Sequence, residues 1–192
     1  MTQNETASAG TEAAHWTAAR AASKSLSYCT ASRTARQVPR WIVSKAVADR
    51  AWPGIVTLLQ RLGFGTPSAT GWVVDARQCT DFTTPDGKRW AWRNRSAEFF
   101  AFHDTTWRMA RPSGAPTEAD KLGMIDRALW TWAASGRIVE YIVLDAARVV
   151  PLLAQAWPTT DMGDATFCAV PWAALAAGGA IVRCSDGVRA AL

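Results

Sequence analysis

Four side chains in the middle of the chain are of types that can bind metal ions. They are Asp86, Glu98, His103 and Asp104. Two or three carboxylates can hold Mg²⁺ for the hydrolysis of phosphate esters. On this interpretation Asp86, Glu98 and Asp104 are catalytic residues of a divergent metal-dependent nuclease or nucleotide hydrolase, with Mg²⁺ as cofactor. The alternative is that His103 and Asp104 form a surface pair or a helix cap, and that the protein needs no cofactor.

The order of these acids resembles the restriction-endonuclease-like family, in which an Asp in a hairpin precedes an acidic residue in a second strand. Asp86 stands next to Gly87 in a favoured hairpin turn, and Glu98 follows it along the chain. The family has a Lys two positions after its second acidic residue, whereas this chain has Phe100 there. The resemblance implies Mg²⁺-dependent cleavage of nucleic acid.

The segment KRWAWRNR combines positive charge with aromatic rings. Its candidate nucleic-acid-binding residues are Lys88, Arg89, Trp90, Trp92, Arg93 and Arg95. Alternate side chains of a strand point to opposite faces, so we expect the three Arg on one face and the two Trp on the other. On an edge hairpin the Arg can contact phosphates, and either Trp can stack on an unpaired base. The alternative is that both Trp pack inward and the Arg residues are only solvated.

Positive charge is concentrated in the N-terminal third. Residues 13–50 hold seven basic residues and one acidic residue, a net charge of +6 in a chain whose total is +5. Arg33 and Arg36 lie in a Ser/Thr-rich stretch, and Arg40 follows it. This distribution favours an acidic partner, nucleic acid first, although a solvated basic face is an equal alternative. Exposed Trp and Arg residues are also typical of protein–protein interfaces, which is a third interpretation.

Asp75 and Asp145 occupy matching positions in GWVVDARQ (71–78) and YIVLDAARVV (141–150). Each follows an apolar run and precedes Ala. A carboxylate at the end of a strand can belong to an active site, but it can also cap the helix that follows. We favour capping, because a single active site seldom needs the same segment twice.

The segment 123–143 resembles the ParB/sulfiredoxin superfamily, in which a Gly-x-x-Arg helix is followed by a Gly and a strand. Gly123 precedes Arg127 by four positions here, and Gly136 precedes an apolar run. The resemblance implies binding of nucleotides or DNA, as in some plasmid fertility-inhibition proteins.

Helices and strands alternate along the chain. We expect helices over 11–26, 40–52, 53–63 (opened by Pro53), 117–136, 146–157 and 171–179, with a kink or early stop at Pro151. We expect strands over 71–76, 137–145, 166–170 and 180–186, and a hairpin around Asp86 and Gly87. The helix 117–136 is predicted from Thr117 as its cap and from the spacing of Leu122, Ile125, Leu129 and Trp132. Residues 96–111 fit either type.

These elements predict an α/β or α+β fold, a single compact mixed-sheet domain over 38–192 behind a basic, partly flexible region 1–37. The four cysteines lack Cys-x-x-Cys spacing and the N-terminus is polar, so we expect a cytoplasmic protein. The uncharged stretch 165–182 is interrupted by Pro171 and Gly178, and we expect no membrane span. The leading functional hypothesis is a nucleic-acid-binding accessory or regulatory protein. The alternatives are the metal-dependent enzyme and a module that regulates a protein partner.

Overall fold

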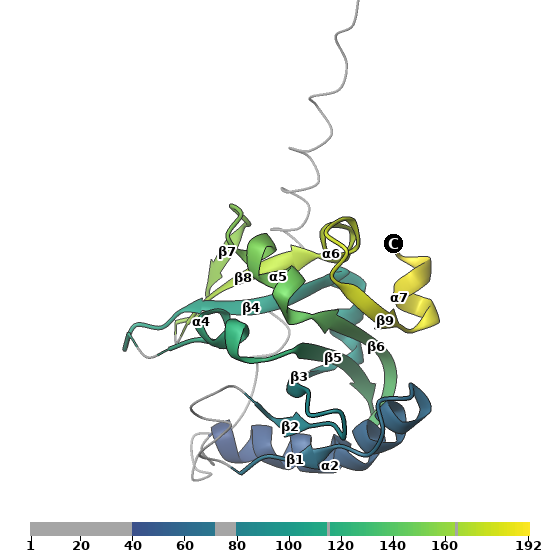
Figure 1. Ribbon diagram of the computed structural model, residues 1–192. Helices are drawn as coiled ribbons and strands as arrows, with labels where there is room; N and C mark the ends of the chain where they lie inside the picture. Colours follow the sequence, from purple (N-terminus) through teal and green to yellow (C-terminus); the bar gives the residue numbers. More distant parts are fainter. Residues whose placement is uncertain (1–39, 72–79, 115, 164) are drawn as a thin grey trace, which may run out of the picture. The chain divides into compact units, whose positions relative to one another are not determined.

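The computed structural model describes residues 40–71, 80–114, 116–163 and 165–192 (Figure 1). Contacts divide the chain after Ile42, and both sheets lie in the unit Val43–Leu192. The larger sheet has the strand order β1–β2–β3–β5–β6–β9. Its strands are β1 (Ser68–Ala69), β2 (Phe82–Thr83), β3 (Arg89–Ser96), β5 (Arg127–Ala134), β6 (Arg137–Asp145) and β9 (Ile181–Cys184). β3 and β5 run parallel, and the other neighbours are antiparallel.

The smaller sheet has the order β4–β8–β7 and is antiparallel. Its strands are β4 (Asp104–Ala110), β7 (Thr159–Asp161) and β8 (Thr166–Pro171). The helices are α2 (Arg40–Arg61), α4 (Glu118–Lys121), α5 (Ala146–Leu153), α6 (Trp172–Ala177) and α7 (Asp186–Ala190), with the 3₁₀ helices η1 (Ala97–Phe102) and η2 (Leu122–Met124). This is the compact mixed α/β domain that the alternating pattern predicts. The strands expected at 137–145, 166–170 and 180–186 are confirmed as β6, β8 and β9.

The predicted hairpin is present, but β3 is not an edge strand. Thr83 pairs with Arg89 across the turn that contains Asp86 and Gly87, and Gly87 has a φ of 78°. A positive φ costs little at glycine, which is why this residue completes the turn. Along its other side β3 pairs with β5 from Trp90 to Ser96. The prediction of an edge hairpin is therefore wrong.

The long helix predicted over 117–136 is also wrong. Thr117 does form the expected capping box with Asp120, but α4 ends after four residues. Residues 127–134 form β5, which turns directly into β6 through Ser135 and Gly136, with φ values of 50° and 78°. β5 is covered by apolar residues on both faces, and a strand of this kind has no polar face to reveal its period of two.

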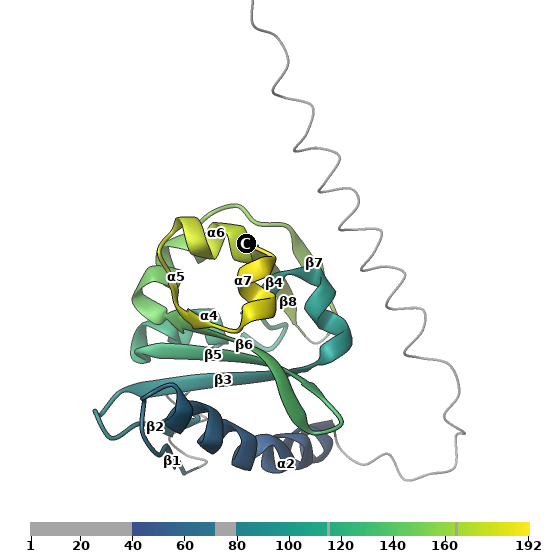
Figure 2. The ribbon, with the colours of Figure 1, turned by 90° about the vertical axis from the view of Figure 1, so that its right-hand side faces the viewer.

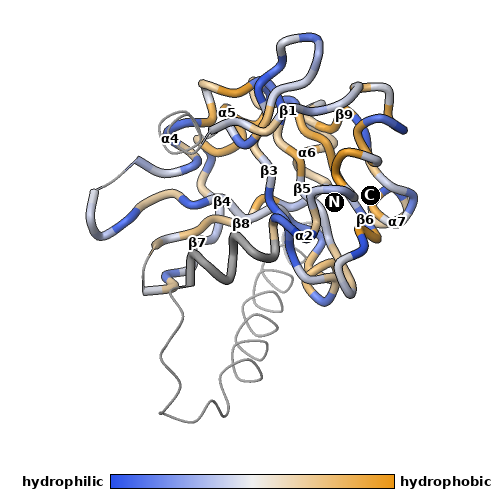
Figure 3. Tube along the Cα trace, turned by 90° about the horizontal axis from the view of Figure 1, so that it is seen from below, coloured by the Kyte–Doolittle hydropathy of each residue, from blue (hydrophilic) through white to orange (hydrophobic). Residues whose placement is uncertain are grey.

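Two hydrophobic cores lie on the two faces of the larger sheet. One contains Ile55 and Leu59 of α2 against Trp90 and Leu129. The other joins Trp130 and Trp132 of β5 to the smaller sheet and to α5, α6 and α7. Figure 2 shows α2 below the sheet and the other helices above it. Figure 3 shows hydrophobic residues along α5 and α6 and hydrophilic residues in several connecting loops.

Two prolines test the expected helix boundaries. Pro53 does not open a new helix, because α2 continues through it to Arg61. The expected helix end is confirmed, since Gly63 follows α2 with a φ of 83°. α5 ends at Leu153, two residues after Pro151, as the early stop predicted. None of the helices in the described ranges combines the length and apolarity that a membrane span requires.

Candidate functional site

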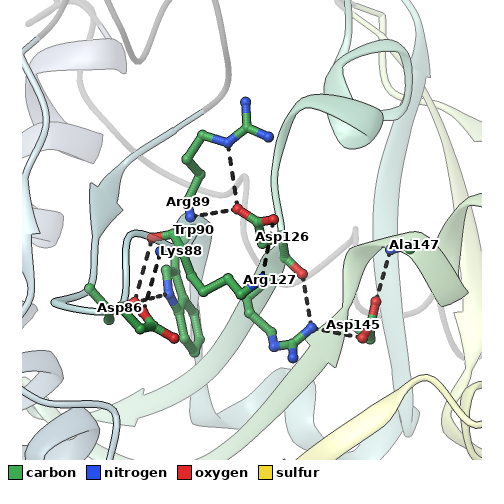
Figure 4. Close-up of polar contacts among 9 residues, drawn as sticks. Asp86, Lys88, Arg89, Trp90, Asp126, Arg127, Asp145 and Ala147 are labelled. Carbon is green, nitrogen blue, oxygen red and sulfur yellow. Dashed lines mark hydrogen bonds and ion pairs between the residues drawn. The ribbon is translucent and has the colours of Figure 1, made fainter.

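The first residues of the expected nucleic-acid-binding arm are held by an acid from a neighbouring loop. The backbone N–H of Arg89 donates to Asp126 Oδ2 at 2.8 Å, and Lys88 Nζ lies 3.8 Å from Asp126 Oδ1 (Figure 4). The hydrogen bond from the Arg89 N–H, more than the nearby charges, lowers the pKa of Asp126. Lys88 and Arg89 remain about half exposed, at 46% and 44% of their side chains. They are therefore the members of the arm that solvent reaches most.

The two tryptophans of the arm belong to the core. Trp90 is 1% exposed and donates its indole N–H to Thr84 Oγ1 at 2.9 Å. Trp92 is 8% exposed and donates to Thr131 Oγ1, also at 2.9 Å. Both pack in the cluster on the α2 side of the sheet. Neither ring presents a face to solvent, so the role expected for them in base stacking gives way to a role in the core.

The remaining arginines of the arm point to the other face, which the second layer covers. Arg93 lies 2.5 Å from Glu118 of α4. Arg95 lies 3.3 Å from Asp104 of β4, which is 4% exposed. The guanidinium of Arg95 also lies 5.2 Å from the centre of the Phe99 ring. The arm therefore does not form a free basic stripe. Arg33 and Arg36 lie outside the described residues, and Arg40 is the first residue of α2.

The three candidate catalytic carboxylates do not assemble. Asp86 lies in the turn before β3, where the hydroxyl of Thr84 donates to it at 2.6 Å and lowers its pKa. Glu98 is exposed in η1. Asp104 of β4 is buried beside Arg95, near the end of β3 that is opposite to Asp86. At about 3.3 Å per strand residue, roughly 20 Å separates the two ends. Across the described ranges, no group of three or more His, Cys, Asp or Glu residues is placed to hold a metal ion. The second strand that the endonuclease resemblance requires at Glu98 is a 3₁₀ helix.

Asp145 caps a helix, as predicted. Its Oδ1 accepts the N–H of Ala147 at 3.1 Å, and its Oδ2 lies 2.7 Å from Arg127 (Figure 4). Asp75 lies outside the described residues. Arg127 begins β5, and Gly123 lies in η2. The helix that the ParB/sulfiredoxin resemblance requires between these two residues is therefore absent.

A further hollow lies elsewhere, between α2, β6 and the turn from β9 to α7. It is an open groove with a volume of about 790 Å³. Its lining includes Arg61 of α2, Arg137, Val139, Glu140 and Tyr141 of β6, and Ser185, Asp186 and Arg189 near α7. Val139 is 49% exposed, so the groove contains one large apolar side chain that solvent reaches. Sequence analysis missed this groove, because its walls come from three separate segments that carry no common motif.

A polar network holds one wall of the groove in place. The Ser185 hydroxyl donates to Glu140 Oε2 and accepts the N–H of Tyr141 at 3.1 Å, while the Ser185 N–H donates to the Tyr141 carbonyl at 3.1 Å. Gly187 lies directly against the Glu140 carboxylate, and a Cβ at this position would displace the end of that side chain. Burial raises the pKa of the Tyr141 phenol. The network fixes the point at which the chain leaves the sheet and enters α7.

The groove has unbalanced positive charge. Its lining carries three arginines, Arg61, Arg137 and Arg189, against two acids, Glu140 and Asp186, and Asp186 lies 3.6 Å from Arg189. Arg61 and Arg137 are exposed, and neither forms an ion pair with another described residue. These two cations are therefore available to a ligand.

Comparison with known proteins adds no relative. No protein-family model matches the chain, and no curated protein is significantly similar to it.

Proposed function

We propose that this protein is a binding module that regulates a protein partner by docking it in the groove between α2, β6 and α7. The observation that carries the proposal is the groove itself, which has a volume of about 790 Å³. The groove combines two exposed arginines, a half-buried tyrosine and an exposed valine. Arg and Tyr are among the residues enriched at the energetically dominant positions of interfaces.

The contacts of the segment 88–95 are the reason that protein docking is placed before nucleic-acid binding. Arg93 and Arg95 are bound to acids within the fold, and the two tryptophans are buried. A surface that is already neutralised by its own fold has less to offer to phosphates. In the groove, in contrast, neither Arg61 nor Arg137 forms an ion pair with a described residue.

The test is site-specific photo-cross-linking in the source cells. A benzophenone side chain at Val139 reports on the groove, and the same group at Val150 of α5 is the matched control, since Val150 is 44% exposed. We expect one or a few proteins to be cross-linked at Val139 and not at Val150, and to be lost when Arg61→Glu and Arg137→Glu are combined. The same proteins at both positions, or none at either, would refute a docking role for the groove.

A second candidate function is the binding of nucleic acid, supported by the +6 charge of residues 13–50. We expect single- or double-stranded DNA or RNA to bind with an affinity that falls steeply with salt, because each phosphate contact releases a counterion. The measurement is a titration at two salt concentrations, with and without Mg²⁺. Replacing Arg33, Arg36 and Arg40 by Gln should reduce both the affinity and its salt dependence. Affinity that hardly changes with salt would contradict this candidate, and cleavage only with Mg²⁺ would support an enzyme instead.

A further inference from the structure

We infer that an extended, acidic segment of the partner protein binds in the groove as an added strand along the free part of β6. This inference rests on the proposed function, because it names the partner's chemistry and its mode of binding at the same groove. Such strand addition takes its affinity from main-chain hydrogen bonds and its selectivity from side chains in neighbouring pockets.

The outer edge of β6 is only partly covered. β6 has nine residues, and β9 pairs with the three from Ile142 to Leu144. Ser185 then bonds to both backbone groups of Tyr141, after which the chain turns into α7. Along residues 137–140 no described strand pairs with this outer edge. The row that β9 occupies, about 4.8 Å from β6, therefore continues without a described strand beside these four residues, while α7 begins next to it, with Gly187 against the Glu140 carboxylate.

Val139 is the residue of this edge that lacks a described strand partner on both sides. β5 pairs with Ile138 and with Glu140, so Val139 is an extra residue without a partner on β5. It has no partner on β9 either, and its side chain is 49% exposed. Unpaired N–H and C=O groups on a strand edge are a template for another extended chain.

Charge selects the kind of chain that fits. Arg61 on α2 and Arg137 at the start of β6 both line the groove, and neither has an acidic partner among the described residues. A strand with carboxylates is attracted by both. A second copy of this chain would bring the same excess of three arginines over two acids to the groove, so a segment rich in carboxylates is the better complement.

The probe is a synthetic peptide of seven residues, acetylated and amidated, in which valine and glutamate alternate. Its affinity is measured by calorimetry, and the exchange of the amides of residues 137–141 is followed by NMR. We expect binding that slows this exchange. We also expect N-methylation of alternate amides along one peptide edge to abolish binding, while the same modification along the other edge has little effect. A peptide with lysine in place of glutamate should not bind.

The protein variants separate charge from shape. Combining Arg61→Glu with Arg137→Glu should weaken binding by on the order of tenfold or more, because rim charges act on complementarity. Arg148→Glu is the matched control, since Arg148 is exposed on α5 and does not line the groove, and it should leave affinity unchanged. The milder pair Arg61→Gln and Arg137→Gln serves if the charge reversal disturbs folding, and it should weaken binding in the same direction.

Several results would overturn strand addition. They are the absence of binding by the acidic peptide, equal binding to the double charge variant, or indifference to N-methylation on either edge. If exchange at residues 137–141 slows as the protein concentration rises, with no peptide present, the occupant of this edge is a second copy of the chain and not an acidic partner. If cross-linking at Val139 succeeds while these peptide tests fail, the groove still docks a partner, and only the strand mode is wrong. If cross-linking fails as well, the proposed function fails with it.

Discussion

Removing the hydrogen bond between Trp92 and Thr131 tests whether this tryptophan stabilises the core or binds a ligand. Thr131 is fully buried on β5, accepts the indole N–H of Trp92 at 2.9 Å and donates to Asn94 Oδ1 at 2.9 Å. Thr131→Val keeps the shape of the side chain but removes this acceptor. The indole N–H is then left buried without a partner, which costs about 1–3 kcal/mol.

The assay is urea unfolding followed by tryptophan fluorescence. With a loss of about 2 kcal/mol and a slope of about 2 kcal/mol per molar, the midpoint should fall by roughly 1 M. Trp92→Phe removes the donor, so the variant with both changes should cost less than the sum of the single variants, by about 1 kcal/mol. A midpoint for Thr131→Val within about 0.2 M of the parent protein, with an unchanged slope, would refute the reasoning.

A variant without a ring decides the question of base stacking. A ring that is 8% exposed cannot lie on an unpaired base, so Trp92→Leu should leave the affinity for single-stranded DNA unchanged within about twofold. A base-stacking tryptophan would lose about 1–3 kcal/mol per base when replaced by a residue without a ring, whereas phenylalanine in its place would still stack. A loss of that size, in a variant that remains folded, would return Trp92 to the binding site.

Three further predictions concern the local interactions that shape the sheet. Asp145→Ala removes both the cap of α5 and the ion pair with Arg127, and should cost about 1–2 kcal/mol in urea unfolding, whereas Asp145→Asn, which keeps a capping oxygen, should cost less. The Arg89 N–H lowers the folded-state pKa of Asp126. The contribution of this carboxylate to stability is therefore full above about pH 4 and is lost as the pH falls through the folded pKa. Asp126→Asn should flatten the decline in stability over that range, and an unchanged decline would contradict this. Gly136→Ala should cost about 1 kcal/mol, because Gly136 has a φ of 78°, which alanine disfavours. An added Cβ would meet no other atom, so the cost comes from the backbone alone. An equally stable variant would show that the turn relaxes.

The residues expected to carry chemistry show where sequence reasoning reached its limit. Residue types and spacing correctly placed Asp86 in a turn and Asp145 at a helix start, because these choices depend on neighbours within a few positions. Arg95 and Asp104 were assigned to separate roles, yet the fold brings them within 3.3 Å of each other. Nothing in a local pattern shows that a cation will find its acid on another strand.

The region 117–136 illustrates the same limit within the fold. Its capping box was predictable, because Thr117 and Asp120 contact each other directly. The spacing of Leu122, Ile125 and Leu129 suggested a helical face, but β5 is flanked by two cores and its residues face them alternately. When both faces are buried, helical and extended conformations can place the same apolar residues in the interior, and pairing with β3 and β6 decides between them.

By itself the sequence determined the mixed α/β class, the hairpin turn, the helix caps and the strands at 137–145 and 166–170, since each depends on propensities and contacts close along the chain. Only the tertiary structure decided that β3 lies inside the sheet, that its tryptophans are core residues, and that its arginines are neutralised by Glu118 and Asp104. The groove is the clearest case. It exists because α2, β6 and α7 meet, and contacts between segments far apart in the chain are set by the packing of the whole domain rather than by any one segment.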